Sequence, residues 1–154
     1  MKNTTSNDSR LERLCKAHLD KLAGQLRPAD RAEMRVMYGW APRAALEQCR
    51  ARSVVAVAWI YQGQVAGVAG VAAQSVLGAT GCVWLWTGPA VKRAPKTFFK
   101  LSRRMLAFFK TLYPHLYAVC EVSYTAARRY LWHLGAKPGP RVRLPAGWGQ
   151  VYRF

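Results

Sequence analysis

The sequence predicts one small, strongly basic α/β domain, and three observations lead to that expectation. A chain of 154 residues has the usual size of a single domain. Its hydrophobic fraction, 51%, is enough for a sizeable core and excludes a globally disordered chain. Helix-period segments alternate with β-branched and aromatic runs, and no repeat or linker divides them. We therefore expect one domain over residues 9–154, after a frayed polar segment over residues 1–8.

Helices are expected in the first 50 residues. Ser9 is placed to cap the first helix, and Glu12 would complete a capping box. Apolar residues then recur at helical spacing as far as Gly24, which is suited to end the helix. A second, short helix follows in the segment LRPADRAEMRVMYGW. Pro42 stands at the favoured first position of a third helix that we expect to run to about Arg50.

The pattern changes to strands from residue 53. The runs SVVAVAWIYQ and QVAGVAGVAA are rich in β-branched and small apolar residues, which is typical of strands. The four residues between them, 61–64, predict a hairpin turn. The run CVWLWT, residues 82–87, predicts a third strand, which Gly88-Pro89 ends.

A strand–helix–strand unit is expected at the centre of the domain. After the third strand, Pro95 begins a long helix to about Leu112, and LYAVCEV, residues 116–122, predicts a buried strand. A helix over residues 125–134 follows, with Gly135 in the C-cap position. Two short segments near the C-terminus are suited to a last hairpin.

The net charge of +17 is large and unevenly placed. Residues 51–154 carry 14 Lys or Arg and a single acid, Glu121, whereas residues 1–50 carry 10 Lys or Arg and 6 acids. Such a field attracts polyanions in a salt-dependent way. The charge alone does not distinguish nucleic acid, a phosphorylated cofactor and an acidic protein as the partner.

The long helix gathers its cations on one side. At about 100° per residue, Lys100, Arg103 and Lys110 fall within about 40° of Lys96, and the apolar residues lie opposite. The simple interpretation is a solvated charged face. The alternative uses the N-terminus of the helix, where free amides and the helix dipole favour a bound phosphate.

Neither a membrane protein nor a metal protein is expected. The N-terminus lacks an apolar signal core, and no apolar run has the length that spans a bilayer, so we expect a cytoplasmic protein with no membrane partner. The cysteines are spread singly and no Cys/His cluster occurs, so they are expected to be reduced, mostly buried thiols, and zinc is not expected.

The chain resembles a known family in several segments. SYTAARRYLWHLGAK is similar to the segment N-x-x-A-x-x-L-Y-x-K-x-G-F of GNAT acyl-CoA N-acyltransferases, and the order of elements is also theirs. GCVWLWTGPAV and the segment from KTFFK to AKPG resemble GNAT-like internal virion proteins of short-tailed bacteriophages. The resemblance covers about residues 27–154 and is clearest over 80–138. It implies a mixed, mostly antiparallel central sheet with flanking helices.

The resemblance implies a site for acetyl-CoA or CoA. In the family, the loop into the long helix holds the cofactor pyrophosphate, and main-chain amides of the preceding strand polarise the thioester. The corresponding cofactor-binding residues here are Trp86, Thr87, Lys92, Arg93, Ala94, Lys96 and Thr97.

Two departures from the family pattern bear on catalysis. The family loop Q/R-x-x-G-x-G/A is replaced by residues 92–98, which contain no glycine and so limit close approach of backbone to the pyrophosphate. The family asparagine falls on Tyr124 and the family catalytic tyrosine on Leu131. Tyr130 is one residue away, about 100° around the helix, and is expected to face the core.

Few residues remain as catalytic candidates. Glu121 follows a central strand and can act as a base, or it can pair with a nearby arginine. Tyr124 and Tyr130 carry hydroxyls near the expected cleft. Glu33 is a further candidate, but Asp30 is expected to cap its helix, which would place Glu33 in the first turn, where the dipole favours an acid.

Three functions are therefore compared. The first is an acyl-CoA-dependent N-acyltransferase, or a CoA-binding relative, encoded by a phage or prophage and present in the bacterial cytoplasm. The second is a catalytically silent protein of virion assembly, held in the virion with other virion proteins and in contact with DNA through its basic surface. The third is sequence-specific nucleic-acid recognition, for which the sequence shows no known module.

Overall fold

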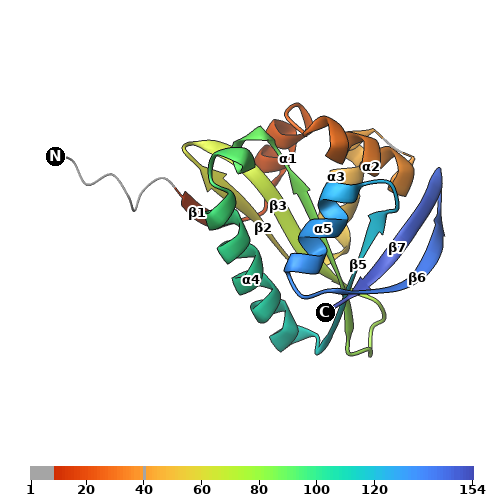
Figure 1. Ribbon diagram of the computed structural model, residues 1–154. Helices are drawn as coiled ribbons and strands as arrows, with labels where there is room; N and C mark the ends of the chain where they lie inside the picture. Colours follow the sequence, from red (N-terminus) through yellow and green to blue (C-terminus); the bar gives the residue numbers. More distant parts are fainter. Residues whose placement is uncertain (1–8, 40) are drawn as a thin grey trace.

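The computed structural model describes residues 9–39 and 41–154, so the expectation for residues 1–8 lies outside the described residues. They form a seven-stranded sheet in the order β1-β2-β3-β4-β5-β7-β6 (Figure 1). Only the β4–β5 pair in this sheet is parallel. The mixed, mostly antiparallel sheet is therefore confirmed. The strands are β1 (Ser9–Arg13), β2 (Ser53–Tyr61), β3 (Gln64–Ala73), β4 (Thr80–Thr87), β5 (His115–Glu121), β6 (Lys137–Leu144) and β7 (Gly147–Arg153).

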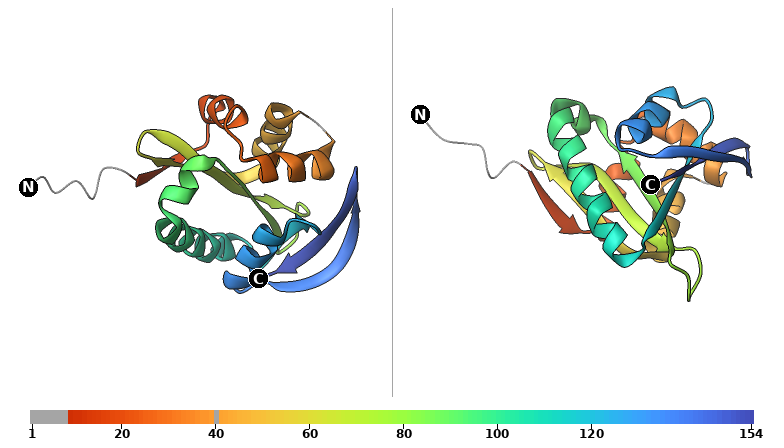
Figure 2. Two further views of the ribbon diagram at one scale, coloured as in Figure 1. Left: turned by 45° about the horizontal axis from the view of Figure 1, so that its top comes forward. Right: turned by 60° about the horizontal axis from the view of Figure 1, so that its bottom comes forward.

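Helices cover both faces of the sheet (Figure 2). The first three lie over one face, and their buried side chains Leu19, Leu22, Met34 and Leu46 meet Val68 and Trp86 of the sheet in one core cluster. The other two lie over the opposite face, where Phe109 packs on Val71 and Leu116. None of the described helices is long and apolar enough to cross a membrane. The helices are α1 (Lys16–Ala23), α2 (Pro28–Tyr38), α3 (Pro42–Arg52), α4 (Pro95–Leu112) and α5 (Thr125–His133).

Most of the predicted elements are confirmed. The β2–β3 hairpin turns through Gln62 and Gly63, whose φ angles of 48° and 76° are those of a tight two-residue turn. Helix α4 has the predicted bounds, and its outward lysines and arginines are exposed. Helix α5 ends beside Gly135, which has a φ of 92°. Strands β6 and β7 form the expected last hairpin.

The predicted helix from Ser9 is wrong at its start. Residues 9–13 instead form β1, which pairs antiparallel with β2 from Ser9 opposite Tyr61 to Arg13 opposite Val57. The helix begins only at Lys16. The physical reason is the edge of β2, which would otherwise present a row of unpaired main-chain groups. The helical spacing of apolar residues in this segment therefore applies to α1 and not to residues 9–13.

The prediction for the second helix also needs correction. Arg27 occupies the N-cap position and Pro28 the first turn, so Asp30 lies inside the first turn and does not cap the helix. Glu33 consequently falls in the middle of α2. Both carboxyl groups are buried, with Asp30 5% and Glu33 8% exposed. They face the sheet, not solvent.

The cysteines mostly follow the sequence expectation. All four cysteines are free thiols; Cys49 and Cys120 are buried, Cys82 is half-buried and Cys15 is exposed. His18 is buried and bonds through its ring to Glu12 (2.9 Å) and to the main-chain N–H of Cys15 (3.2 Å). This histidine has a packing role at the start of α1.

Replacing Gly70 by alanine should lower the free energy of unfolding by about 2 kcal/mol. An added Cβ would lie 2.7 Å from the Trp84 ring and 2.8 Å from the carbonyl oxygen of Val55. Gly24→Ala is the matched control, because its φ is −79° and the nearest atom to its added Cβ lies 3.9 Å away. Urea unfolding compares the two, and equal stability of both variants would contradict this packing.

Candidate functional site

The parallel strands β4 and β5 separate part-way along their length. Their ladder holds at three residue pairs, of which the last joins Cys82 to Tyr117. Beyond it, residues 83–87 and 118–121 run apart, and no ladder joins these two described segments. Adjacent strands are normally about 4.8 Å apart. Strands that diverge leave their facing main-chain groups free and open a gap through the sheet.

The gap belongs to a cleft of about 730 Å³. Asp30, Glu33 and Trp86 line it on the side of α2, and Phe98 and Tyr130 line it on the side of α4 and α5. Most of the other lining side chains are apolar, and the volume is in the range of small-molecule sites. The cleft thus connects the two faces of the sheet.

On one side the cleft reaches the N-terminus of α4, where Lys92 lines it. The first main-chain bond of this helix runs from the Phe98 N–H to the Ala94 carbonyl (2.9 Å). The amides of Lys96 and Thr97 therefore have no acceptor within the helix. Together with the exposed Lys92 and Lys96 side chains and the helix dipole, they make a site suited to an anion.

Arg93, also predicted to hold the cofactor, is engaged elsewhere. Its Nη2 donates to Gln64 Oε1 (2.9 Å), and its guanidinium lies 5.8 Å from the centre of the Tyr61 ring. Both partners belong to the end of the β2–β3 hairpin. A contact between Arg93 and a ligand at the α4 N-terminus would require the side chain to leave these partners.

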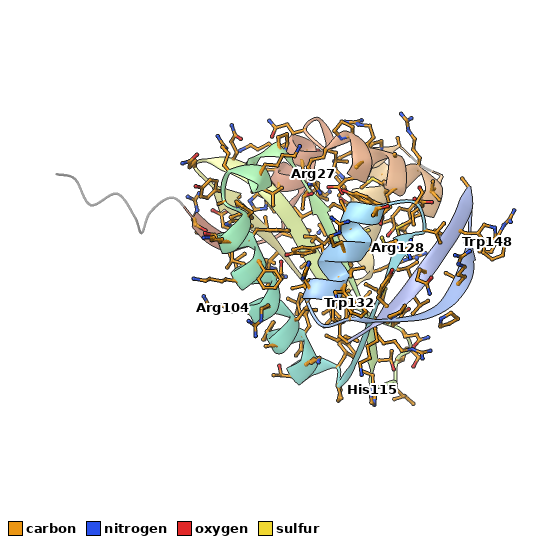
Figure 3. The ribbon with its side chains drawn as sticks, viewed as in Figure 1. Arg27, Arg104, His115, Arg128, Trp132 and Trp148 are labelled. Atoms are coloured by element: carbon orange, nitrogen blue, oxygen red, sulfur yellow. The ribbon has the colours of Figure 1, made fainter. Side chains whose placement is uncertain are left out.

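A carboxylate network bridges the wide end of the gap. Asp30 Oδ2 accepts from the main-chain N–H of Thr87 (3.0 Å) and from its hydroxyl. Asp30 Oδ1 accepts from the Tyr124 hydroxyl (2.8 Å). Arg27, labelled in Figure 3, donates to Asp30 (3.3 Å) and to Tyr124 (3.0 Å). This Asp30 network joins α2, the end of β4 and the residue before α5.

Tyr124 acts in this network as a donor. Burial, followed by the Asp30 carboxylate, raises the pKa of its hydroxyl, which therefore keeps its proton at neutral pH. Tyr124, to which the resemblance assigns the family asparagine position, therefore joins two elements of the cleft wall.

The resemblance assigns the polarising amides to Trp86 and Thr87, but the main chain of β4 presents a further amide to the gap. Thr87 bonds away from β3 through both its N–H, to Asp30, and its carbonyl, which accepts from the Arg27 N–H (3.3 Å). Main-chain groups two residues apart in a strand point the same way, so the N–H of Leu85 also faces the gap. The amide of Trp86 belongs to the ladder with β3, and its indole ring lines the cleft.

Glu33 is the second carboxyl of α2 that lines the cleft. Its Oε2 lies 3.9 Å from the Cys120 sulfur. Burial, and then the Asp30 and Glu121 carboxylates, raise the pKa of Glu33 to about 8. A carboxyl that titrates near neutral pH inside a cleft can take up or give a proton during a reaction. Burial likewise raises the pKa of the Cys120 thiol, so this cysteine is a poor nucleophile.

Glu121, the first candidate base from the sequence, does not line the cleft. Its Oε2 accepts from the main-chain N–H of Ser123 (3.0 Å) and from the Ser123 hydroxyl. No ion pair of the described residues includes Glu121, although its carboxylate, after the hydrogen bond to Tyr152, contributes to the raised pKa of Arg128. The fold therefore offers Glu33, and not Glu121, to a ligand in the cleft.

Tyr130 stands in the cleft wall between α4 and α5. Its ring stacks on Phe98 (5.3 Å between centres), which stacks on Trp59 of β2 (5.6 Å). Its hydroxyl donates to Ser102 of α4. Burial raises the pKa of Tyr130 to about 12, so the hydroxyl is protonated at neutral pH. Leu131, at the family tyrosine position, packs with the Cys120 cluster.

Comparison with known proteins identifies the fold. No protein-family model and no curated protein matches the sequence. Solved structures do match. RimL, a ribosomal L7/L12 α-N-protein acetyltransferase in complex with coenzyme A, has a TM-score of 0.71 at 11% identity over 97% of this chain and 94% of its own. The fold is that of the GCN5-related N-acetyltransferases.

Two further solved structures agree with this fold. A GCN5-related N-acetyltransferase from Brucella melitensis has a TM-score of 0.67 at 17% identity, covering 97% of this chain and 76% of its own. The microcin C7 self-immunity acetyltransferase MccE, in complex with acetyl-CoA and AMP, has a TM-score of 0.69 at 10% identity, covering 97% and 93%. At these identities, the likeness establishes the GCN5-related N-acetyltransferase fold and nothing finer.

Within the GCN5-related N-acetyltransferase fold, the sequence interpretation missed residues that act across elements. Asp30 contacts Thr87, 57 positions away, and Tyr124, 94 positions away. Arg27 and Ser102 were missed for the same reason. One signal was available: Asp30 and Glu33 are three residues apart, which places both acids on one face of a helix. Among the residues that the structure describes, no group of three His, Cys, Asp or Glu could hold a metal.

Asp30→Ala should lower the free energy of unfolding by about 3 kcal/mol, because it leaves the Thr87 amide and the Tyr124 hydroxyl buried without their acceptor. Asp20→Ala is the control. Asp20 also pairs with an arginine, Arg43 (2.6 Å), but its side chain is 66% exposed, so its loss should cost under about 1 kcal/mol. Denaturant unfolding measures the free energy of unfolding of both variants. Similar losses would show that the Asp30 network stabilises the fold no more than an exposed ion pair does.

Glu33 should make the protein less stable as pH rises from about 5 to about 8. The pKa of Glu33 is about 8 in the fold, whereas that of an unfolded glutamate is about 4.3. In this interval the folded state holds a proton that the unfolded state has lost, so rising pH favours unfolding. Glu33→Gln should gain stability relative to the wild type over this range in urea titrations at several pH values. Parallel pH dependence of the two proteins would refute the raised pKa.

Proposed function

We propose that the chain is an acyl-CoA-dependent N-acyltransferase. The observation that carries this proposal is the single cleft that connects the anion site at the α4 N-terminus with the buried carboxyl of Glu33 through the β4–β5 gap. The neighbours support it, since RimL was solved with coenzyme A and MccE with acetyl-CoA. The anion site suits the phosphates of the cofactor, and a proton acceptor in the same cleft suits acyl transfer from a thioester to an amine.

The residues at the α4 N-terminus fit a pyrophosphate. The free amides of Lys96 and Thr97 would each donate to a phosphate oxygen, and Lys92 and Lys96 would supply the positive charge. The side-chain cations compensate for the absence of glycine in residues 92–98. The pantetheine chain would then follow the apolar cleft past the Phe98–Tyr130 stack.

The catalytic roles follow from what faces the cleft. Acyl-CoA supplies an electrophilic thioester carbon and a thiolate leaving group. The N–H of Leu85 would donate a hydrogen bond to the carbonyl oxygen and polarise it. Glu33, as a carboxylate, would accept the proton that the amine loses when nitrogen bonds to the acyl carbon. The sulfur would leave as a thiolate and take its proton from water, because the Tyr130 hydroxyl donates to Ser102 and has a pKa of about 12.

A second candidate is favoured by two observations. Arg93 is bound to Gln64 and Tyr61 instead of facing the anion site, and the loop has none of the family glycines. These features also suit a catalytically silent virion protein that contacts DNA, as the resemblance to phage internal virion proteins implies. In that case the protein would be found in the virion and not only in the bacterial cytoplasm, and it would not bind coenzyme A.

Isothermal titration with CoA and with acetyl-CoA tests the binding step. Both ligands should bind, and Lys92→Ala/Lys96→Ala should weaken binding at least about tenfold, because two charged partners of the phosphates are lost. Lys100→Ala/Lys110→Ala removes the same charge from the outward side of α4 and should change the affinity less than about twofold. Absence of binding at millimolar ligand, or equal effects of the two variants, would reject the proposed site.

Thiol release from acetyl-CoA in the presence of primary amines tests the chemical step. The rate should rise with an apparent pKa near 8, and Glu33→Gln should lose most of it while still binding CoA. Glu47→Gln is the control, because Glu47 lies on α3 in ion pairs with Arg43 and Arg50, away from the cleft. A Glu33→Gln variant with the wild-type rate and pH profile would exclude Glu33 as the base.

A further inference from the structure

Two tryptophans on the C-terminal half of the chain are exposed. Trp132 of α5 is 65% exposed and Trp148 of β7 is 47% exposed. Large aromatic side chains are normally buried in a domain with a core of this size, so an exposed pair is a candidate contact surface. Trp148 is also held in place, because the guanidinium of Arg143 lies 5.2 Å from the centre of its ring.

Both tryptophans lie on the same side of the molecule. Trp148 and Tyr152 are four residues apart on β7, so their side chains share one face of the strand. Tyr152 packs with residues of α5 and accepts a hydrogen bond from Arg128 Nε (2.9 Å). Figure 3 shows Arg128 and Trp132 on α5 and Trp148 at the outer end of the β6–β7 hairpin.

Arginines surround these rings. Arg129 lies on the exposed side of α5, Arg143 is level with Trp148 on the neighbouring strand, and Arg141 shares its face. We call this surface the α5–β7 face, and define it by Arg128, Arg129, Trp132, Arg141, Arg143 and Trp148.

One acid acts on this positive charge: after the hydrogen bond to Tyr152, the Glu121 carboxylate contributes to the raised pKa of Arg128. Glu121, the single acid after residue 50, is level with Gly149, so its side chain points to the opposite side of the sheet from Trp148. Among the described residues, none of the four arginines forms an ion pair with a carboxylate. The charge of the α5–β7 face is therefore available to an anionic partner.

The α5–β7 face contains a hollow with fixed walls. A pocket of about 360 Å³ lies between Arg128, Arg129 and Trp132 on one side and Pro138 and Tyr152 on the other. Arg128 is held there by bonds from Nε to the Tyr152 hydroxyl and from Nη1 to the Val122 carbonyl (2.9 Å each). Because these bonds fix its plane, the guanidinium loses little freedom when a phosphate arrives.

We propose that the α5–β7 face binds single-stranded nucleic acid. Aromatic rings that stand among arginines are the combination that holds an unpaired strand: the bases stack on the rings and the phosphates meet the guanidinium groups. A duplex keeps its bases stacked inside and offers only phosphates, so it would leave the two tryptophans unused. This surface is separate from the outward lysines of α4, which carry no tryptophan among them; the exposed aromatic ring on that helix is Phe108 (50%).

Fluorescence anisotropy with a labelled oligo(dT) and a labelled oligo(U) of about 16 nucleotides tests the proposal, at about 50 and 200 mM salt. One or both strands should bind more tightly than a duplex of equal length, and the preferred strand identifies DNA or RNA as the natural partner. Trp132→Ala/Trp148→Ala should weaken binding at least about tenfold with little change in the salt dependence. Both residues are exposed, so the variant should fold, which circular dichroism checks.

The charge has its own matched pair of variants. Arg129→Gln/Arg143→Gln should weaken binding and lower the slope of log affinity against log salt by about 1.4. Lys100→Gln/Arg103→Gln removes the same charge from α4 and should change the affinity less than about twofold. The proposal is overturned if the duplex or an acidic polypeptide binds as tightly as the single strand. It is equally overturned if the tryptophan variant binds like the wild type, or if both charge variants weaken binding alike.

Discussion

The carboxylate of Asp30 is the interaction on which the shape of the cleft depends. Strands β4 and β5 are joined at three residue pairs, and beyond Cys82 and Tyr117 no ladder determines how far apart they stand. Asp30 takes over that task at the wide end, because it holds Thr87 of β4 and Tyr124 after β5 at the same time. Both partners are donors to one buried carboxylate, and Arg27 balances its charge.

This arrangement has chemical consequences at the cleft. The amide of Thr87 is occupied by Asp30, so the next amide on that side of the strand, from Leu85, becomes the available one. The negative charge of Asp30 also lies close to Glu33 on the same helix and, together with burial, keeps the proton on Glu33 up to about pH 8. One buried carboxylate thus holds the cleft open and sets the proton affinity of the neighbouring acid.

Local signals in the sequence predicted the elements that depend on neighbours along the chain. Pro95 and a clean division of apolar and basic residues determine α4, and the Gln62-Gly63 turn determines the β2–β3 hairpin. Residues 9–13 were wrongly assigned to a helix because the deciding partner, the free edge of β2, lies about 50 positions later. The Asp30 network could not be predicted either, since it joins residues almost 100 positions apart. The sequence predicted Glu33 in the first turn of its helix, whereas the observed start of α2 at Pro28 places it in the middle.

The positive charge of the chain gathers at two places that we assign to different ligands, the N-terminus of α4 and the α5–β7 face. The cations at the α4 N-terminus lie at the cleft mouth, while the arginines of the α5–β7 face stand beside exposed tryptophans.

A crystal structure of the protein grown with coenzyme A tests the central claim most directly. The account predicts the pyrophosphate on the amides of Lys96 and Thr97, the pantetheine between β4 and β5, and the sulfur beside the Leu85 amide on the way to Glu33. Coenzyme A bound outside the cleft, or a cleft that remains filled by protein side chains at saturating ligand, would contradict it.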